Sequence, residues 1–177
     1  MRILIHALNS RGYEPKDRVK LMGLLRSLGL SIINVRVASN HIEVDANANN
    51  IDELPPVVGR VIGPILGVVN LSTGNEVSNP FKSFVDLFNE ERFWEAHEVL
   101  EPTWRVNRDI NIQGLIVAAA AFVKIQENYI DSFLKLAKRA LGMIMVNQVD
   151  CIDALSFREG LRASLSTLKP FKARCIT

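Results

Sequence analysis

The sequence has few of the residues that build covalent or metal-bound frameworks. It contains two cysteines, Cys151 and Cys175, and three histidines in 177 residues. It has neither a Cys-x-x-Cys pair nor a cysteine–histidine cluster with the spacing of a zinc site. Two isolated cysteines do not form a disulfide framework. We therefore expect both to be reduced and the protein to be cytoplasmic.

The sequence also lacks a glycine-rich phosphate loop, an excess of charge of one sign and a long apolar segment. The net charge is +2, and neither residues 1–70 nor residues 71–177 are strongly basic, which argues against nucleic acid as a partner. The most apolar stretch, Ile110–Val123, contains polar residues and is too short to cross a bilayer. We expect no membrane partner.

Aromatic residues are nearly absent from the first part of the chain. Eleven of the twelve follow residue 80, and the exception is Tyr13. With 48% hydrophobic and 23% charged residues, the composition is that of a globular protein. The uneven distribution of aromatic residues predicts two domains with separate cores.

Residues 1–70 show the periodicity of alternating strands and helices. Strands are predicted at residues 3–8, 31–38, 41–46 and 65–70, and helices at 15–28 and 51–62. These assignments rest on apolar runs and period-two alternation for strands and on helical spacing for helices. The β-α-β-β-α-β order predicts an α+β fold of the ferredoxin-like type, an α/β sandwich.

Alternation divides the predicted sheet into two faces. The apolar face, which would contact the helices, contains Ile33, Val35, Val37, Ile42 and Val44. The opposite, polar face contains Asn34, Arg36, His41, Glu43 and Asp45. We expect this polar face to be open and to mediate self-association as a homo-oligomer. The strands carry no aromatic side chain on which a base could stack, so RNA binding is not expected.

Residues 71–79 have the composition of a linker, and residues 80–177 have a helical pattern throughout. Helices are predicted from Asn79-Pro80 to Phe88, and then at Phe93–Trp104, Ile110–Gln126, Ile130–Val146 and Ile152–Leu168. Asn79-Pro80 is a capping residue followed by a proline, a typical helix start. Five helices with short connections predict an all-α helical bundle domain.

The segment Glu95-Ala96-His97-Glu98-Val99-Leu100-Glu101-Pro102-Thr103-Trp104 is the least ordinary part of the chain. On a helix, His97, Glu101 and Trp104 share a face, because they are separated by three, four and seven residues. The next helix offers Gln113 and Lys124 as partners. The candidate polar site therefore comprises His97, Glu98, Glu101, Trp104, Gln113 and Lys124.

This site has three interpretations. A buried polar network that fixes the packing of two helices is favoured. A pocket for a small molecule or a partner is the second. The third is a hydrolase-like or metal-assisted enzyme, in which Glu98 or Glu101 orients His97 as a general base or joins it in holding a divalent ion. Because His97 is the only histidine after residue 80, we expect neither a metal nor another cofactor.

Two motifs occur in order within this region. The first helix reads Phe93-Trp94-Glu95-Ala96-His97-Glu98-Val99-Leu100-Glu101 with Trp104 after it, and the second reads Ile112-Gln113-Gly114-Leu115-Ile116 followed by Ala118-Ala119-Ala120. This pair resembles the domain of unknown function 309 family over residues 80–145. The resemblance implies an all-helical fold, and the signature corresponds to His97, Glu98, Glu101, Trp104 and Gln113. It implies no activity.

The sequence therefore predicts a binding or regulatory protein that self-associates, with a polar network or pocket at His97, Glu101 and Gln113. An enzyme that uses His97 with Glu98 or Glu101 is the alternative. A small-molecule ligand is compatible with either prediction.

Overall fold

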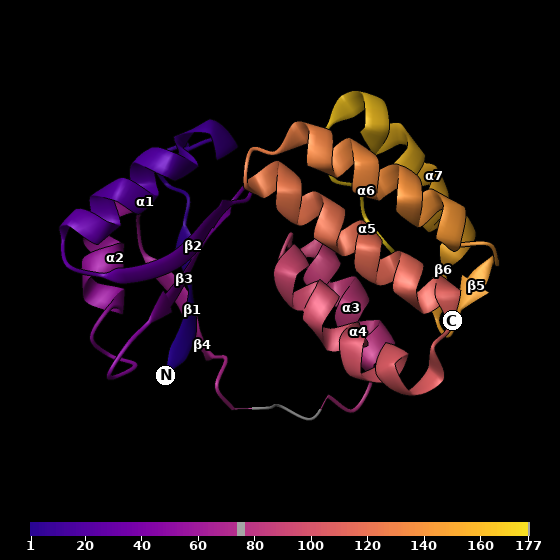
Figure 1. Ribbon diagram of the computed structural model, residues 1–177, viewed down its shortest axis with the longest axis horizontal. Helices are drawn as coiled ribbons and strands as arrows, with labels where there is room; N and C mark the ends of the chain where they lie inside the picture. Colours follow the sequence, from indigo (N-terminus) through magenta and orange to yellow (C-terminus); the bar gives the residue numbers. More distant parts are fainter. Residues whose placement is uncertain (74–76, 177) are drawn as a thin grey trace. The chain divides into compact units, whose positions relative to one another are not determined.

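The computed structural model describes residues 1–73 and 77–176, which fold as two compact units (Figure 1). The units are Met1–Asn75 with Gln126–Asn128, and Glu76–Ile125 with Tyr129–Thr177. The boundary between them falls within the predicted linker, residues 71–79. Residues 74–76 of that linker lie outside the described part of the chain.

The first unit is a four-stranded antiparallel sheet with α1 and α2 on one side of it (Figure 1). Its elements are β1 (Arg2–Leu8), the 3-10 turn η1 (Pro15–Asp17), α1 (Arg18–Ser27), β2 (Ser31–Val37), β3 (His41–Asn47), α2 (Pro55–Val61) and β4 (Ile65–Asn70). The strand order is β2-β3-β1-β4. This β-α-β-β-α-β arrangement confirms the predicted ferredoxin-like fold.

The apolar face of the sheet forms the core of this unit with the helices. Val35, Val37, Ile42 and Val44 are buried as predicted, but Ile33 is 41% exposed. The register between β2 and β3 shifts between Ile32 and Asn34, and Ile32 takes the buried position instead. Such an irregularity inserts one residue into the alternation, which a strict period of two does not anticipate.

The polar face of the sheet is not open, contrary to the expectation from the sequence. Five of its side chains are between 0% and 7% exposed: His6, Arg36, His41, Glu43 and Asp45. Alternation in a sequence shows which side chains share a face of a sheet. It does not show whether that face is covered, so the burial of these charges was not predictable from the pattern.

The second unit confirms the predicted run of helices. Its elements are α3 (Pro80–Asn89), α4 (Phe93–Asn107), α5 (Ile110–Gln126), α6 (Ile130–Met143), β5 (Gln148–Val149), β6 (Ile152–Asp153) and α7 (Ala154–Thr167). α3 packs against α4, and α6 packs against α7. Among the described residues, no helix is both long and apolar enough to cross a membrane.

Phenylalanine rings form the centre of the helical core. The ring of Phe88 lies between 4.9 and 5.6 Å, centroid to centroid, from five others: Phe84, Phe93, Phe122, Phe157 and Phe171. Aromatic pairs at such separations add stability beyond the burial of their area. The helical unit therefore has its own core, separate from the aliphatic core of the first unit.

The C-terminal region differs from the prediction in two respects. A short hairpin, β5–β6, follows α6, which ends at Met143. Cys151 and Cys175 form a disulfide bond, with their Cα atoms 4.7 Å apart, so the expectation of reduced cysteines is wrong for this structure. The chain after α7 returns to pair Cys175 with Ile152. A contact between residues 24 positions apart gives no local signal in the sequence.

Candidate functional site

The predicted site helix, α4, continues through Pro102 to Asn107. Phe93, Ala96 and Leu100 face the core and are buried, so packing holds this helix although proline removes one backbone donor. Because the helix continues past Pro102, Glu101 stays one turn after His97. The predicted helical spacing of these two residues is therefore present.

The imidazole of His97 has a carboxylate near each ring nitrogen. His97 Nδ1 lies 3.1 Å from Glu98 Oε1, and His97 Nε2 lies 3.6 Å from Glu101 Oε1. The side chains of His97, Glu98 and Glu101 are 27%, 49% and 21% exposed. This group is therefore partly open to solvent and is not the buried network that the sequence favoured.

Two tryptophans lie before and after this group along α4. Trp94 and Trp104 both pack partly against the core, and Arg108 Cζ lies 4.7 Å from the centre of the Trp104 ring. We call the line of side chains at spacings of three and four the α4 stripe. It comprises Trp94, His97, Glu98, Glu101, Trp104 and Arg105.

Charge at the start of α4 is balanced by Arg92. Its guanidinium contacts Glu95, and its Nη1 lies 3.2 Å from Glu90 Oε2. Burial alone would lower the pKa of Arg92, but hydrogen bonds and charge from Glu95 and Glu90 outweigh burial and raise that pKa. Arg92 therefore stays charged and fixes the two glutamates beside the start of the helix.

The remaining predicted site residues do not join His97. Among the hydrogen bonds and ion pairs of the described residues, His97 contacts only Glu98 and Glu101. Gln113 is half-buried on α5, and Lys124 Nζ lies 5.8 Å from the centre of the Tyr129 ring. The structure thus brings together His97, Glu98 and Glu101 on α4. Among the described residues, neither Gln113 nor Lys124 forms a hydrogen bond or an ion pair with His97.

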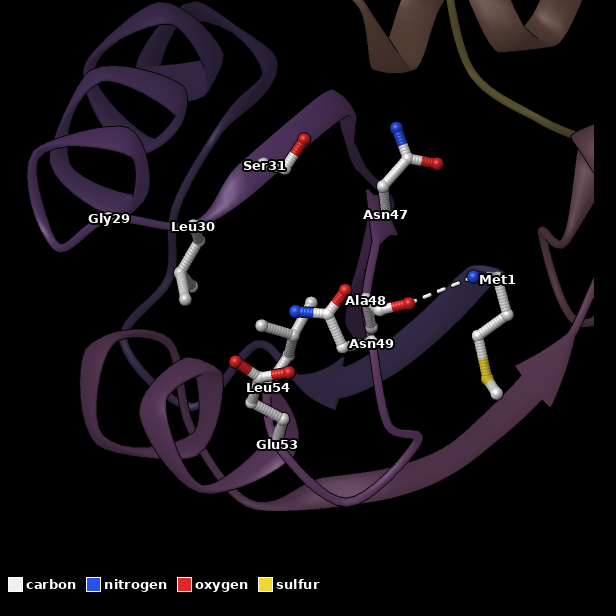
Figure 2. A pocket seen from close by; sticks show the side chains of 9 residues that line it. All are labelled: Met1, Gly29, Leu30, Ser31, Asn47, Ala48, Asn49, Glu53 and Leu54. Carbon is white, nitrogen blue, oxygen red and sulfur yellow. Dashed lines mark hydrogen bonds between the residues drawn. The ribbon is translucent and has the colours of Figure 1, made fainter.

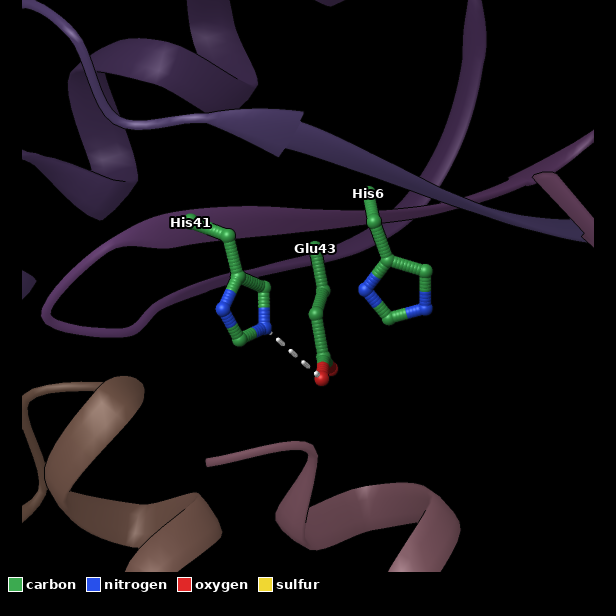
Figure 3. A group of neighbouring side chains, drawn as sticks. All are labelled: His6, His41 and Glu43. Carbon is green, nitrogen blue, oxygen red and sulfur yellow. Dashed lines mark ion pairs between the residues drawn. The ribbon is translucent and has the colours of Figure 1, made fainter. Parts of the chain in front are cut away.

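The sheet of the first unit carries a second histidine–glutamate cluster (Figure 3). His6 on β1 pairs in register with Glu43 on β3, and His41 lies two residues before Glu43, so all three side chains project from one face. The rings of His6 and His41 are 5.4 Å apart, centroid to centroid. His41 Nε2 lies 3.6 Å from Glu43 Oε1. We call these three residues the sheet cluster.

The sheet cluster was not predicted from the sequence. Alternation assigns His41 and Glu43 to the polar face, whereas His6 lies within the apolar run of residues 3–8. The available signal was period two along β1, which puts His6 on the face opposite Ile3, Ile5 and Ala7. Pairing of β1 with β3 completes the cluster, and that pairing is a property of the fold.

Arginine side chains surround the carboxylates of the sheet. Arg36 Nη1 lies 3.3 Å from Glu43 Oε2, and Arg36 Nη2 lies 3.5 Å from Asp45 Oδ2. Arg2 donates to both oxygens of Asp45, at 2.9 and 2.6 Å. Burial of charge is expensive unless the charges are paired, and these ion pairs supply that compensation for Glu43 and Asp45.

A pocket of about 420 Å³ also opens on the first unit (Figure 2). It is lined by Met1, Gly29, Leu30, Ser31, Asn47, Ala48, Asn49, Glu53 and Leu54. The Met1 ammonium group donates to the carbonyl oxygen of Ala48 at 2.9 Å. Glu53 is the one lining residue with an ionisable side chain, and no predicted site residue lies there. This lining contains no set of groups suited to acid–base or nucleophilic chemistry.

The second motif of the helical unit has a steric role. A Cβ atom added at Gly114 on α5 would lie 2.5 Å from Ile144 Cγ1 and 3.1 Å from Met143 Cβ, so only glycine lets α5 pass the end of α6 this closely. The two motif helices, α4 and α5, follow each other in the order predicted from the sequence. The close approach of α5 to the end of α6 gives a physical reason for the glycine in the Gln-Gly-Leu-Ile motif. Residues 81–136 match DUF309, a domain of unknown function.

The DUF309 match confirms the resemblance found in the sequence. It covers α3, α4, α5 and the first half of α6, so the α4 stripe lies inside it. The sheet cluster and the pocket lie outside it. No curated protein matches the chain. The match therefore supports the helical fold of this region and assigns no activity to it.

Proposed function

We propose that this protein is a self-associating binding protein in which the α4 stripe of one copy receives a basic face of α6 from a second copy. The supporting observation is the partly exposed group of His97, Glu98 and Glu101, which presents two carboxylates between two tryptophans. Trp and Arg are enriched among the residues that carry most of the energy of protein interfaces.

The basic face of α6 comprises Lys135, Lys138 and Arg139. These three side chains are exposed and lie at spacings of three and four, so they share one side of the helix. Within residues 1–73 and 77–176, none of them forms a salt bridge. The face therefore offers three positive charges to a second molecule.

Opposite charges on two faces of one unit favour a symmetric pair. In a two-fold dimer, α4 of the first copy meets α6 of the second, and the reverse contact is equivalent. Complementary charge of this kind contributes chiefly to specificity and to the rate of association. We expect an association that weakens as salt is added.

The enzyme alternative has less support. His97 contacts no serine, threonine or cysteine among the described side chains, and both of its ring nitrogens face carboxylates. A general base needs a free nitrogen within reach of the proton that it abstracts.

The cytoplasmic location also stays a prediction. The disulfide bond between Cys151 and Cys175 argues against it, because reducing compartments keep cysteine thiols reduced.

Sedimentation equilibrium of the full chain tests the proposal. We expect a dimer at about 0.1 M NaCl that dissociates at about 1 M NaCl, because the Debye length falls from about 10 to about 3 Å. A protein that stays monomeric at low salt and high concentration would contradict self-association and would favour a small-molecule ligand.

A charge-swap experiment tests the two faces directly. Lys135→Glu with Lys138→Glu gives one variant, and Glu98→Lys with Glu101→Lys gives the other. Each variant alone brings like charges together and should be monomeric. An equal mixture restores both opposite-charge contacts and should dimerise. Arg162→Glu, an exposed change on α7, is the matched control and should dimerise like the unchanged protein. Failure of the mixture to associate would exclude this pair of faces.

A further inference from the structure

We infer that the first unit binds one divalent transition-metal ion at the sheet cluster, with His6, His41 and Glu43 as ligands. This inference is independent of the proposed self-association, which rests on the helical unit. The sequence led us to expect no metal, because the three ligands are not close enough along the chain to form a recognisable metal-binding motif. The inference reverses that expectation. Zn²⁺ is the ion that this donor set suits best among common divalent metals.

The fold places the three donors on two neighbouring strands. One ligand atom from each residue lies within 4.8 Å of the other two. Ligand atoms of a tetrahedral zinc site with bonds of about 2.1 Å are about 3.4 Å apart. The distance of 3.6 Å between His41 Nε2 and Glu43 Oε1 is close to that value, so these two ligands already have nearly the required separation.

Two of the ligand atoms lack a hydrogen bond where water is excluded. His41 Nε2 and Glu43 Oε1 are buried and form no hydrogen bond with any described residue, and their side chains belong to residues that are 7% and 0% exposed. At 3.6 Å they are too far apart to bond each other. Buried polar atoms without hydrogen bonds are unfavourable, and an ion between the two would satisfy both.

Neighbouring residues orient the glutamate as a ligand. Glu43 Oε2 accepts from Arg36 Nη1 at 3.3 Å, which leaves Oε1 facing the histidine. Carboxylates that bind metals commonly accept a hydrogen bond from a second residue in this way. Arg36 also lies 3.5 Å from Asp45 and 3.8 Å from Glu127. Its positive charge is therefore balanced by three carboxylates, which reduces its repulsion of a bound cation.

A proton on His41 is the competing explanation of the same geometry. A protonated imidazole beside the Glu43 carboxylate would form an ion pair with no metal. The two explanations differ in their response to added Zn²⁺, because only a bound metal ion makes the state of the two histidine rings depend on the ion. A metal ion binds the neutral ring and persists there.

Metal binding by the full chain tests the inference. The protein is stripped with a chelator, and Zn²⁺ is then added at about pH 7.5, above the usual imidazole pKa, with heat measured by calorimetry. We expect about one ion per chain, the stoichiometry of one three-ligand site. Side-chain ¹⁵N spectra should show the ring nitrogens of His6 and His41 shifting on addition of Zn²⁺, while those of His97 stay unchanged.

Matched variants decide which histidines are involved. His41→Ala and Glu43→Gln should each weaken zinc binding by at least about 100-fold, and Arg36→Lys by about 10-fold, in line with losses seen when supporting residues change. His97→Ala is the control, because His97 also has two glutamates beside it. It should bind zinc like the unchanged protein.

Two outcomes would overturn the inference. The first is the absence of zinc binding by the folded, chelator-treated protein, with ring nitrogens that respond only to pH. The second is binding that survives Glu43→Gln but is lost in His97→Ala, which would move the ion to α4. Glu43→Gln keeps the size of the side chain, and its circular dichroism spectrum shows whether the unit is folded, so a loss of binding is attributable to the ligand.

Discussion

The two units of this protein place histidine beside glutamate in opposite environments. On the sheet, His41 and Glu43 are two residues apart and are 7% and 0% exposed. On α4, His97 and Glu101 are four residues apart, with side chains 27% and 21% exposed. Each spacing is the one that puts two side chains on a common face of its element. Histidine and glutamate therefore need different partners for their polar atoms in the two units. The helical pair is partly accessible to solvent, whereas the buried sheet pair depends on partners that the protein or a bound ion supplies.

The largest expected difference concerns the arginines that accompany the two pairs. Arg36→Met leaves the buried Glu43 carboxylate without its arginine partner and should lower the free energy of unfolding by about 3–5 kcal/mol. Arg105, 71% exposed, lies 3.5 Å from Glu101, and Arg105→Met should change it by no more than about 0.5 kcal/mol. Urea unfolding followed by circular dichroism measures both. Equal losses would show that burial does not distinguish the two sites.

The second expected effect concerns the covalent bond in the helical unit. Cys151→Ser removes the disulfide bond with Cys175 and should lower the free energy of unfolding by about 3 kcal/mol, because the open chain gains conformational entropy. Both tryptophans lie in this unit, so their fluorescence reports its unfolding. A reductant should destabilise the unchanged protein to the same extent and leave the variant unaffected. A variant as stable as the oxidised protein would contradict this contribution.

The third effect compares a tight and an open glycine position. Gly114→Ala puts a methyl group against Ile144 and should cost about 1–3 kcal/mol. Gly142 on α6 has no atom within 4 Å of an added Cβ, so Gly142→Ala should be neutral or should stabilise by up to about 1 kcal/mol. Thermal unfolding followed by tryptophan fluorescence measures both changes. A loss in Gly142→Ala as large as that in Gly114→Ala would show that close packing of α5 on α6 is not the cause.

The smallest effect concerns His97 itself. Because its carboxylate partners are partly exposed and no hydrogen bond joins it to Gln113 among the described residues, His97→Ala should lower the free energy of unfolding by less than about 1 kcal/mol. Combined with Gln113→Ala, the two losses should add to within about 0.5 kcal/mol, as for residues without a shared contact. A double-mutant cycle in urea provides the measurement. Strong coupling between His97→Ala and Gln113→Ala would support the buried polar network that was predicted from the sequence.

Local patterns predicted most of the fold. Alternation and helical spacing located four strands and the helices, because each element shows its period within a few residues. The hairpin β5–β6 was missed, since two-residue strands show no period. Pro102 was tolerated inside α4 because burial of Leu100 on one side of the helix outweighs one missing backbone hydrogen bond.

The site was predictable only where it is local. His97, Glu98 and Glu101 are neighbours on one helix, and the structure brings them together as the spacing indicates. Gln113 and Lys124 depend on how α5 is rotated against α4, which the spacing within each helix does not determine. The sheet cluster depends on the register of β1 with β3, two strands separated by the whole of α1 and β2. Such contacts arise from topology.

The bond between Cys151 and Cys175 makes the last helix part of a covalent ring. α7 lies entirely between the two cysteines, so a protease that cuts within it opens the ring and releases no fragment. The cut protein would keep its mass under oxidising conditions and would separate into two pieces only after reduction. A nick in α7 is therefore invisible on a non-reducing gel, and the redox state of the surroundings decides whether the nicked chain stays in one piece.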